Sequence, residues 1–430
     1  MVENEVGIEN YYRIGPMYEK KILIEFKDNF YGITLSAHLI AHFYDSLSKF
    51  VKQLGKPFFI DPMTYVFARD LNNIKKRDKV KISFQKFINF LPQQTQQILE
   101  RRELLPIDFY ENKREMIDIF ARNILEFQRN FIKAINKKED PTTKTIRRYR
   151  EILQRREGGD EEILPSFLTS AYFYFESIED PWYNISLSLA KKIKQIEQDD
   201  PIYPIICFSK ELLLNADEIK QIIDDYKEFE GIIFWINDFN EQQENVLYLK
   251  QFNNFTQELV ANFKVVYNLY GDYYSLLLTK RGLKGYSRGV GMSEKRNVDA
   301  STQGGGNPER YYLPFLHTYT SKTYAREFFA ERTDLLCNCD FCEELKKEIL
   351  LSHSQNDLAE EFFNRINYVV DAKKHFILSH NEEIKLIEEL SLKDLTSRVI
   401  EQIEETKKYR LFLYNLNNLH LTRWHSSLFG

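Results

Sequence analysis

Residues 231–269 read GIIFWINDFNEQQENVLYLKQFNNFTQELVANFKVVYNL, and this stretch decides the expected fold. The apolar run Gly231 to Ile236 predicts a buried strand, and Phe263 to Leu269 predicts another. Between them, Glu244 to Ala261 has the apolar spacing of an amphipathic helix. Two buried strands joined by a helix indicate a parallel pair, because a parallel connection must cross back over the sheet.

The same alternation repeats along the chain. Further strands are predicted at Tyr31 to His38, Pro57 to Ile60, Pro165 to Phe175, Ile202 to Phe208, Gly285 to Gly291 and Asp334 to Leu336. Helical spacing lies between most of them, at Leu39 to Leu54, Trp182 to Glu197, Ala216 to Phe229 and Ser321 to Glu331. About eight such units predict an α/β fold, and specifically a (β/α)8 TIM-type barrel.

A stretch without clear strands divides this barrel. We expect residues 1–78 to begin the barrel with its first two strands, 79–160 to form a helical insertion after strand 2, 161–336 to complete the barrel, and 337–430 to form a zinc-binding segment with C-terminal helices. At 430 residues, the chain is long enough for such a barrel with insertions.

The segment CNCDFC at 337–342 holds three of the four cysteines in the chain. Three thiolates and one imidazole complete the tetrahedral set that Zn2+ prefers and leave no open position, which makes such a site structural. The expected zinc ligands are Cys337, Cys339, Cys342 and His380, with His353 and His375 as alternatives for the histidine.

The net charge of −5 argues against attraction of the whole protein to nucleic acid, so such binding requires a local basic patch. Residues 144–156, KTIRRYREILQRR, carry six positive charges against one acid. An alternative explanation of these charges is a helix face that is simply exposed to solvent. The residues predicted to contact nucleic-acid phosphates are Arg147, Arg148, Arg155 and Arg156.

Three features of the sequence bear on where the protein is located in the cell. The first ten residues are acidic and polar, no apolar run approaches a membrane span, and cysteines are few outside the metal-type cluster. These features predict a cytoplasmic protein without a membrane partner.

Carboxylates follow several of the predicted strands. Asp61 ends the run FFID, and Asp238 ends FWIND. In a barrel the carboxyl ends of the strands hold the active site, and a poorly solvated carboxylate has a raised pKa that suits acid/base work. Asp61 and Asp238 are therefore the predicted catalytic residues, whereas Asp272 in the run YGD is predicted to cap a helix.

The predicted substrate residues come from the seventh predicted strand and the glycine-rich loop after it. They are Arg288, Gly304, Gly305, Gly306, Arg310, Tyr311 and Tyr312. Consecutive glycines allow a close approach of backbone to a ligand, although a flexible lid has the same composition. Arg310 is expected to hold a phosphate and the two tyrosines to stack on a base, while His317 is expected to be structural.

The cysteine segment followed by His380-Asn381 resembles the tRNA-guanine transglycosylases, including their archaeosine-type and DNA-modifying 7-deazaguanine relatives. Gly289-Val290-Gly291 and Phe59-Ile60-Asp61 are similar to further segments of that family. The resemblance implies a divergent base-exchange transglycosylase, which inserts a 7-deazaguanine-type base into nucleic acid through a carboxylate nucleophile. The long insertion and the loop at 293–316 favour DNA over tRNA.

The family's late nucleophilic aspartate has no clear match in this chain, and two alternatives therefore stay open. One is a catalytically inactive, zinc-containing barrel protein that binds nucleic acid. The other is a barrel enzyme for a small molecule, because one fold hosts many reactions. A protein partner or a homodimer also stays open.

Overall fold

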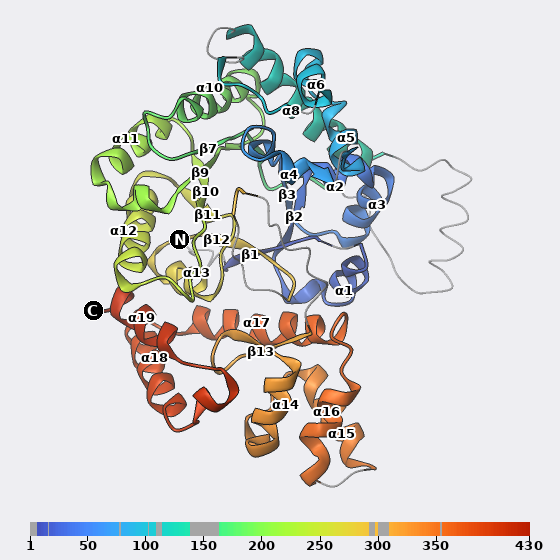
Figure 1. The fold of residues 1–430 in the computed structure, drawn as a ribbon, viewed down its shortest axis with the longest axis vertical. Coiled ribbons are helices and arrows are strands. Elements are labelled where there is room, and N and C mark those ends of the chain that lie inside the picture. The colour runs from blue at the N-terminus through green and yellow to red at the C-terminus, as the bar shows by residue number, and fades with distance from the viewer. Residues whose placement is uncertain are drawn as a thin grey trace, which may run out of the picture.

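The computed structural model describes residues 7–15, 17–76, 79–101, 103–108, 114–137, 163–291, 297–299, 309–352 and 355–430. Figure 1 shows two parts: a sheet surrounded by helices, and a smaller, mostly helical part below it that contains the C-terminal third of the colour range. Helix α17 (Asp371–Glu389) runs along the boundary between the two parts.

The sheet contains eight parallel strands among the described residues. They are β1 (Glu9–Arg13), β2 (Gly32–Ser36), β3 (Phe58–Asp61), β7 (Tyr174–Phe175), β9 (Ile205–Ser209), β10 (Gly231–Asn237), β11 (Val265–Asn268) and β12 (Gly285–Gly289). Their order is β3-β2-β1-β12-β11-β10-β9-β7. All seven residues of β10 are buried, as expected for a parallel sheet that is covered on both faces. The predicted α/β fold with a parallel sheet is confirmed.

The ladder of the sheet is open between β3 and β7 in the described residues. The short strand β6 (Leu168–Thr169) pairs with β8 (Ile202–Tyr203) in a separate parallel ladder. Two bonds join this segment to β3: Ser166 N donates to Phe58 O at 2.8 Å, and Thr169 Oγ1 donates to Ile60 O at 2.6 Å. Residues 166–169 therefore lie beside β3, the strand at one end of this curled sheet.

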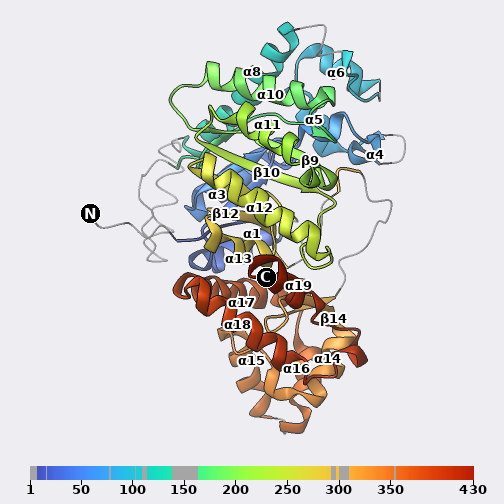
Figure 2. The ribbon, with the colours of Figure 1, turned by 90° about the vertical axis from the view of Figure 1, so that its left-hand side faces the viewer.

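Helices follow most strands, and Figure 2 shows several of them side by side against the sheet. They are α1 (Glu19–Glu25), α2 (Ala37–His42), α3 (Tyr44–Leu54), α10 (Pro181–Ile196), α11 (Ala216–Tyr226), α12 (Val246–Asn262) and α13 (Tyr273–Leu278). Local sequence sets their starts, because Asp180, Asn215 and Asn245 each accept a backbone N–H of the first turn. None of the described helices combines the length and low charge that a membrane span requires.

The helical insertion lies between β3 and β6. Its described elements are α4 (Leu71–Ile74), the pair β4 (Lys75–Lys76) and β5 (Lys79–Val80), α5 (Ile82–Ile88), α6 (Gln93–Glu100) and α8 (Arg114–Ile135). The amphipathic α8 packs against α10 and α3. The insertion follows the third strand of the sheet and not the second, because β1 was not predicted.

The strand predictions missed one strand, β1, and included one segment that is no strand. The sequence ENYYR of β1 lacks an apolar run, yet all five residues are buried between β2 and β12. Conversely, Asp334 to Leu336 is no strand: Thr333–Leu335 forms a 3-10 turn, and Asp334 pairs with Arg332 at 2.6 Å. The sheet is therefore completed by the first residues of the chain.

The C-terminal part begins with an antiparallel hairpin of β13 (Arg310–Leu313) and β14 (Thr318–Ser321). Its helices are α14 (Lys322–Glu331), α15 (Asp340–Leu350), α16 (Leu358–Arg365), α17, α18 (Leu392–Thr406) and α19 (Leu419–Leu428). Helix α17 packs on β13 and on α13, and α19 packs on α12. The hairpin and these helices therefore attach to the sheet through the α12–α13 side.

We predict that Gly285→Ala destabilises the fold at the contact between β1 and β12. An added Cβ would lie 1.9 Å from the backbone oxygen of Glu9, so the two strands must separate. We expect a loss of about 2–4 kcal/mol in the free energy of unfolding, measured by urea denaturation. Gly15→Ala is the control, since its Cβ would meet nothing closer than 3.4 Å. Equal stability of the two variants would contradict this account.

Candidate functional site

Three cysteines and one histidine converge in the C-terminal part. The ligand atoms of Cys337, Cys339, Cys342 and His375 all lie within 4.8 Å of one another, so they can hold one metal ion. Cys339, Cys342 and His375 are buried, and Cys337 is partly exposed. Cys337 and Cys339 lie just before α15 and Cys342 lies in its first turn, whereas the histidine comes from α17. This donor set of three sulfurs and one nitrogen fits Zn2+ in a closed, structural site.

The hydrogen bonds of His375 direct its ring toward the sulfurs. Nε2 lies 2.9 Å from the carbonyl oxygen of Tyr312, while Nδ1 lies 3.3 Å from Cys342 Sγ and 3.6 Å from Cys339 Sγ. The carbonyl oxygen can only accept a hydrogen bond, so Nε2 carries the proton and donates, which leaves the lone pair of Nδ1 for a metal.

The prediction of His380 as the fourth ligand is wrong, and His375 takes that position. Both histidines lie on α17, but five residues correspond to about 140° of rotation on a helix, so they point in different directions. His380 faces the sheet, where its Nε2 lies 2.6 Å from the hydroxyl of Tyr286.

Tyr311 and Tyr312 support the metal centre and are not free to stack on a base. Both are completely buried. The ring of Tyr311 stacks on His375 with centroids 4.3 Å apart, and its hydroxyl lies 3.6 Å from Cys342 Sγ. The hydroxyl of Tyr312 donates to Glu383 at 2.7 Å. The predicted contact of these rings with a substrate base is therefore not supported.

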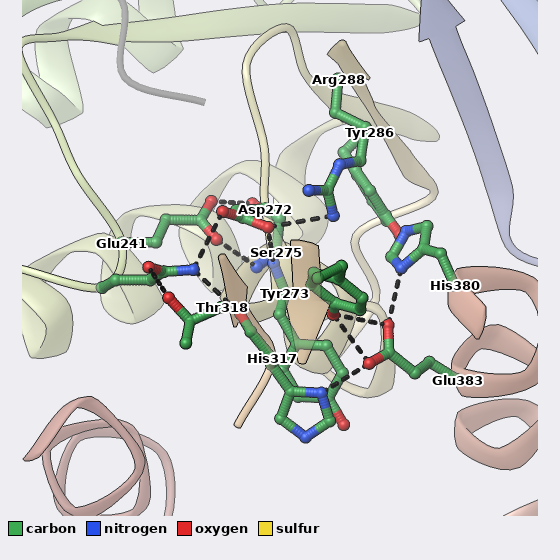
Figure 3. A network of polar contacts seen from close by, with 12 residues as sticks. Glu241, Asp272, Tyr273, Ser275, Tyr286, Arg288, His317, Thr318, His380 and Glu383 are labelled. Atoms are coloured by element: carbon green, nitrogen blue, oxygen red, sulfur yellow. Dashed lines mark hydrogen bonds and ion pairs between the residues drawn. The ribbon is translucent and has the colours of Figure 1, made fainter. Parts of the chain in front are cut away.

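Glu383 is the centre of a buried network where the C-terminal part meets the sheet (Figure 3). Its carboxylate accepts from Tyr312, lies 2.7 Å from His317 Nδ1 and lies 2.8 Å from His380 Nδ1. Burial alone would raise the pKa of Glu383, but the nearby His317 and the hydrogen bonds from both histidines lower it to about 2. His317 is thus held within this network by Glu383.

Arg288 on β12 belongs to the same region and is fully buried. Its Nη1 lies 3.0 Å from Asp272 Oδ1, and its guanidinium lies 4.4 Å from the ring centre of Phe376 on α17. Asp272 also accepts from the backbone N–H of Tyr273 and caps α13, as predicted. The prediction that Arg288 contacts substrate is not supported, because the side chain is enclosed by protein.

Glu241 extends the network beyond Asp272 and was not predicted from the sequence. It accepts from the backbone N–H of Ser275 at 3.0 Å. Burial, and then the charge of Asp272, raise the pKa of Glu241 to about 7. Nothing in its local sequence signals this environment, because the contact joins the loop after β10 to a residue of α13 that is 34 positions away.

Asp61 lies at the carboxyl edge of the sheet, where it was predicted, but it is fully buried. Tyr172 donates to its Oδ1 at 2.9 Å, Tyr270 donates to Oδ2 at 3.1 Å, and the backbone N–H of Met63 donates at 3.0 Å. Burial raises the pKa of Asp61, against the lowering effect of these bonds. The carboxylate is thus covered by two tyrosines and lacks direct access to a substrate.

Two other carboxylates at this edge are more exposed. Asp238 is partly exposed and follows β10 with a left-handed backbone, φ 54°. Asp299 is half exposed, with a side-chain exposure of 50%, and its Oδ1 accepts from Arg69 Nε at 2.8 Å. Val298 N donates to Asn237 Oδ1 at 2.8 Å, which holds residues 297–299 over the end of β10. Asp299 was missed because it follows no predicted strand.

Several predicted residues lie outside the described residues. They are Arg147, Arg148, Arg155, Arg156, Gly304, Gly305 and Gly306. Arg310 is described and exposed at the start of β13.

Comparison with known proteins yields no further assignment. The chain matches no family model, no curated protein and no solved structure. Function must therefore be argued from the site itself.

We predict that the purified protein carries about one zinc ion per chain and that His375→Ala loses it, because a closed site needs all four ligands. His380→Ala, on the same helix, is the matched control and should retain zinc. Elemental analysis of both variants after dialysis against a weak chelator measures this. Zinc retained by His375→Ala and lost by His380→Ala would contradict the ligand assignment.

We also predict that acidification destabilises the network through His380. Burial, together with the charge of Arg288, lowers the pKa of His380 to about 4 against the effect of Glu383. Below about pH 6.5, His380 binds a proton in the unfolded chain, but in the folded protein it does so only below about pH 4. Stability should therefore fall across this window by on the order of 1–3 kcal/mol.

His380→Gln should show a smaller fall, because glutamine cannot take up that proton. Urea denaturation at pH 7, 5.5 and 4 measures the difference. His425→Gln, on the partly exposed side of α19, is the control and should keep the pH dependence of the wild type. An equal pH dependence in the wild type and in His380→Gln would refute the assignment.

Proposed function

We propose that this chain is a base-exchange transglycosylase, which replaces a purine in nucleic acid by a 7-deazaguanine-type base. One observation carries the proposal: the carboxyl edge of the parallel sheet collects Asp61, Asp238 and Asp299 in a chain whose C-terminal part holds the Cys3His cluster. The resemblance of the cysteine segment to the tRNA-guanine transglycosylases supports it further.

The proposed reaction requires a carboxylate that reaches the sugar. A carboxylate oxygen attacks C1′ of the target nucleotide, and the bond from C1′ to the purine nitrogen breaks with both electrons on the base. The departing purine takes a proton from an acid group. The incoming base loses its own proton, attacks C1′ from the same face as the first base, and releases the carboxylate. The target nucleotide must leave the base stack for this attack.

Exposure divides the roles among the carboxylates. Asp238 and Asp299 are open enough to attack C1′, and Arg69 orients Asp299. Asp61 is covered, so it acts on a departing base only through the hydroxyls of Tyr172 or Tyr270. Asp61, which was predicted to be catalytic, is therefore assigned a positioning role.

The zinc cluster, the sheet and the basic residues have other roles in the proposed function. The zinc ion is structural, because its ligand set is closed and lies in the C-terminal part. We further propose that the curled sheet acts as a (β/α)8 barrel, given the bonds that join Ser166 and Thr169 to β3. The substrate is assigned as DNA rather than tRNA, with Arg147, Arg148, Arg155 and Arg156 on its phosphates. The protein is expected to work in the cytoplasm.

A covalent complex with a guanine-containing oligonucleotide tests the proposal. The complex should survive denaturing electrophoresis and have the mass of protein plus oligonucleotide minus the free base, because the base leaves when the ester forms. Asp299→Asn and Asp238→Asn are made separately, and the variant that lacks the nucleophile should form at least about 10³-fold less complex, as expected for loss of a group that acts in the transition state.

Asp224→Asn is the matched control, since Asp224 is exposed in the last turn of α11, which leads into the start of β10 and so lies away from the carboxyl edge. DNA and RNA oligonucleotides of one sequence identify the nucleic acid. Failure of both to form a complex at saturating protein would end the proposal of base exchange.

The covered carboxylate of Asp61 favours one second candidate, a zinc-containing protein that binds nucleic acid without chemistry. Salt-dependent binding without a covalent complex, weakened when the four arginines are replaced by glutamine, would favour that candidate.

A further inference from the structure

The amino-terminal ends of several strands surround a cavity. It has a volume of about 800 Å3 and lies at the opposite edge of the sheet from Asp61 and Asp238. Its lining comes from the starts of β1 and β11, the end of α3 and the segments that lead into β2, β3, β6 and β12. A cavity of this size accommodates a ligand as large as a nucleotide.

The charges that line this cavity are mostly positive. Lys27, Lys52, Lys56 and Lys284 face one carboxylate, Glu9. Glu9 is engaged within the wall: its Oε1 lies 3.2 Å from Lys284 Nζ, its Oε2 accepts from the hydroxyl of Tyr267, and its side chain is only 8% exposed. The charge of Lys284 is therefore offset by Glu9, whereas the charges of Lys27, Lys52 and Lys56 are not offset by a carboxylate in the lining of the cavity.

These three lysines form no ion pair with any carboxylate in the part of the chain that the structure describes. Lys52 Nζ donates to the backbone oxygen of Lys137 at 3.3 Å, which fixes the ammonium beside the cavity. Gathering like charges around one cavity costs free energy unless an anion offsets them. The chain as a whole is acidic, with a net charge of −5, so this concentration of positive charge is local.

We propose that this cavity binds the diphosphate or triphosphate group of a small phosphorylated ligand. Lysine ammonium groups bind phosphate as mobile point charges and need no fixed fork geometry. Two of the three tyrosines of the wall are packed rather than free to stack: Tyr203 stacks on Phe167 with centroids 4.5 Å apart, and Tyr267 is 4% exposed. Recognition therefore rests on the phosphate charge. The site is independent of the proposed base exchange, which uses the other edge of the sheet.

Isothermal titration of the full chain with inorganic pyrophosphate and, separately, with ATP tests the site. Both should bind saturably, and Lys27→Gln/Lys52→Gln/Lys56→Gln should raise each Kd roughly tenfold or more, since one charged hydrogen bond contributes on the order of a factor of ten. Equal affinities identify the phosphate groups alone as the ligand, and tighter binding of ATP adds a contact to the nucleoside. Both of these outcomes support the proposal.

The control variant Lys220→Gln/Lys250→Gln/Lys393→Gln removes the same charge from exposed positions on α11, α12 and α18. It should bind like the wild type. Absence of binding to both probes, or an equal loss in the control variant, overturns the proposal. Should the cavity variant fail to fold, acetylation of the wild type decides the question. Pyrophosphate must then protect Lys52 and Lys56 but not Lys220 from acetic anhydride, and equal labelling with and without pyrophosphate overturns the proposal.

Discussion

Helix α17 is the constraint on which the arrangement of the whole molecule depends. His375 on this helix completes the metal cluster, while His380 and Glu383 join the network under β12. Near its start, the buried Lys373 pairs with Glu19 of α1. A buried charge without its partner costs several kcal/mol, so these contacts must all form together. The rotation of one helix therefore sets the metal centre and the attachment to the sheet at the same time.

The parallel sheet separates two kinds of chemistry. Its carboxyl edge presents acidic groups, of which Asp238 and Asp299 are open to solvent and Asp61 is covered. Its amino edge presents lysines around a cavity. Strands that all run in one direction place their ends at two distinct faces, so the two groups of residues do not compete for one site.

Burial changed the role of several residues that look functional in the sequence. Tyr311 and Tyr312 have the composition of a base-stacking pair, but they pack against His375 and Glu383. Arg288 was predicted to contact substrate, yet it is enclosed between Asp272 and Phe376. In each case a long-range contact replaces the substrate, because the C-terminal part covers this side of the sheet.

The sequence by itself determined the alternation of strands and helices, the gathering of three cysteines and the cap at Asp272, because each depends on neighbours a few positions away. It did not reveal β1, whose ENYYR pattern is buried only once β2 and β12 lie beside it. Tertiary structure alone decided between His375 and His380, since both lie on one helix and only its rotation against β13 selects the ligand. It also brought Asp299 to Arg69, and Lys27 to Lys52 and Lys56. Local periodicity does not indicate which distant elements come into contact, because those contacts are decided by the packing of the whole chain.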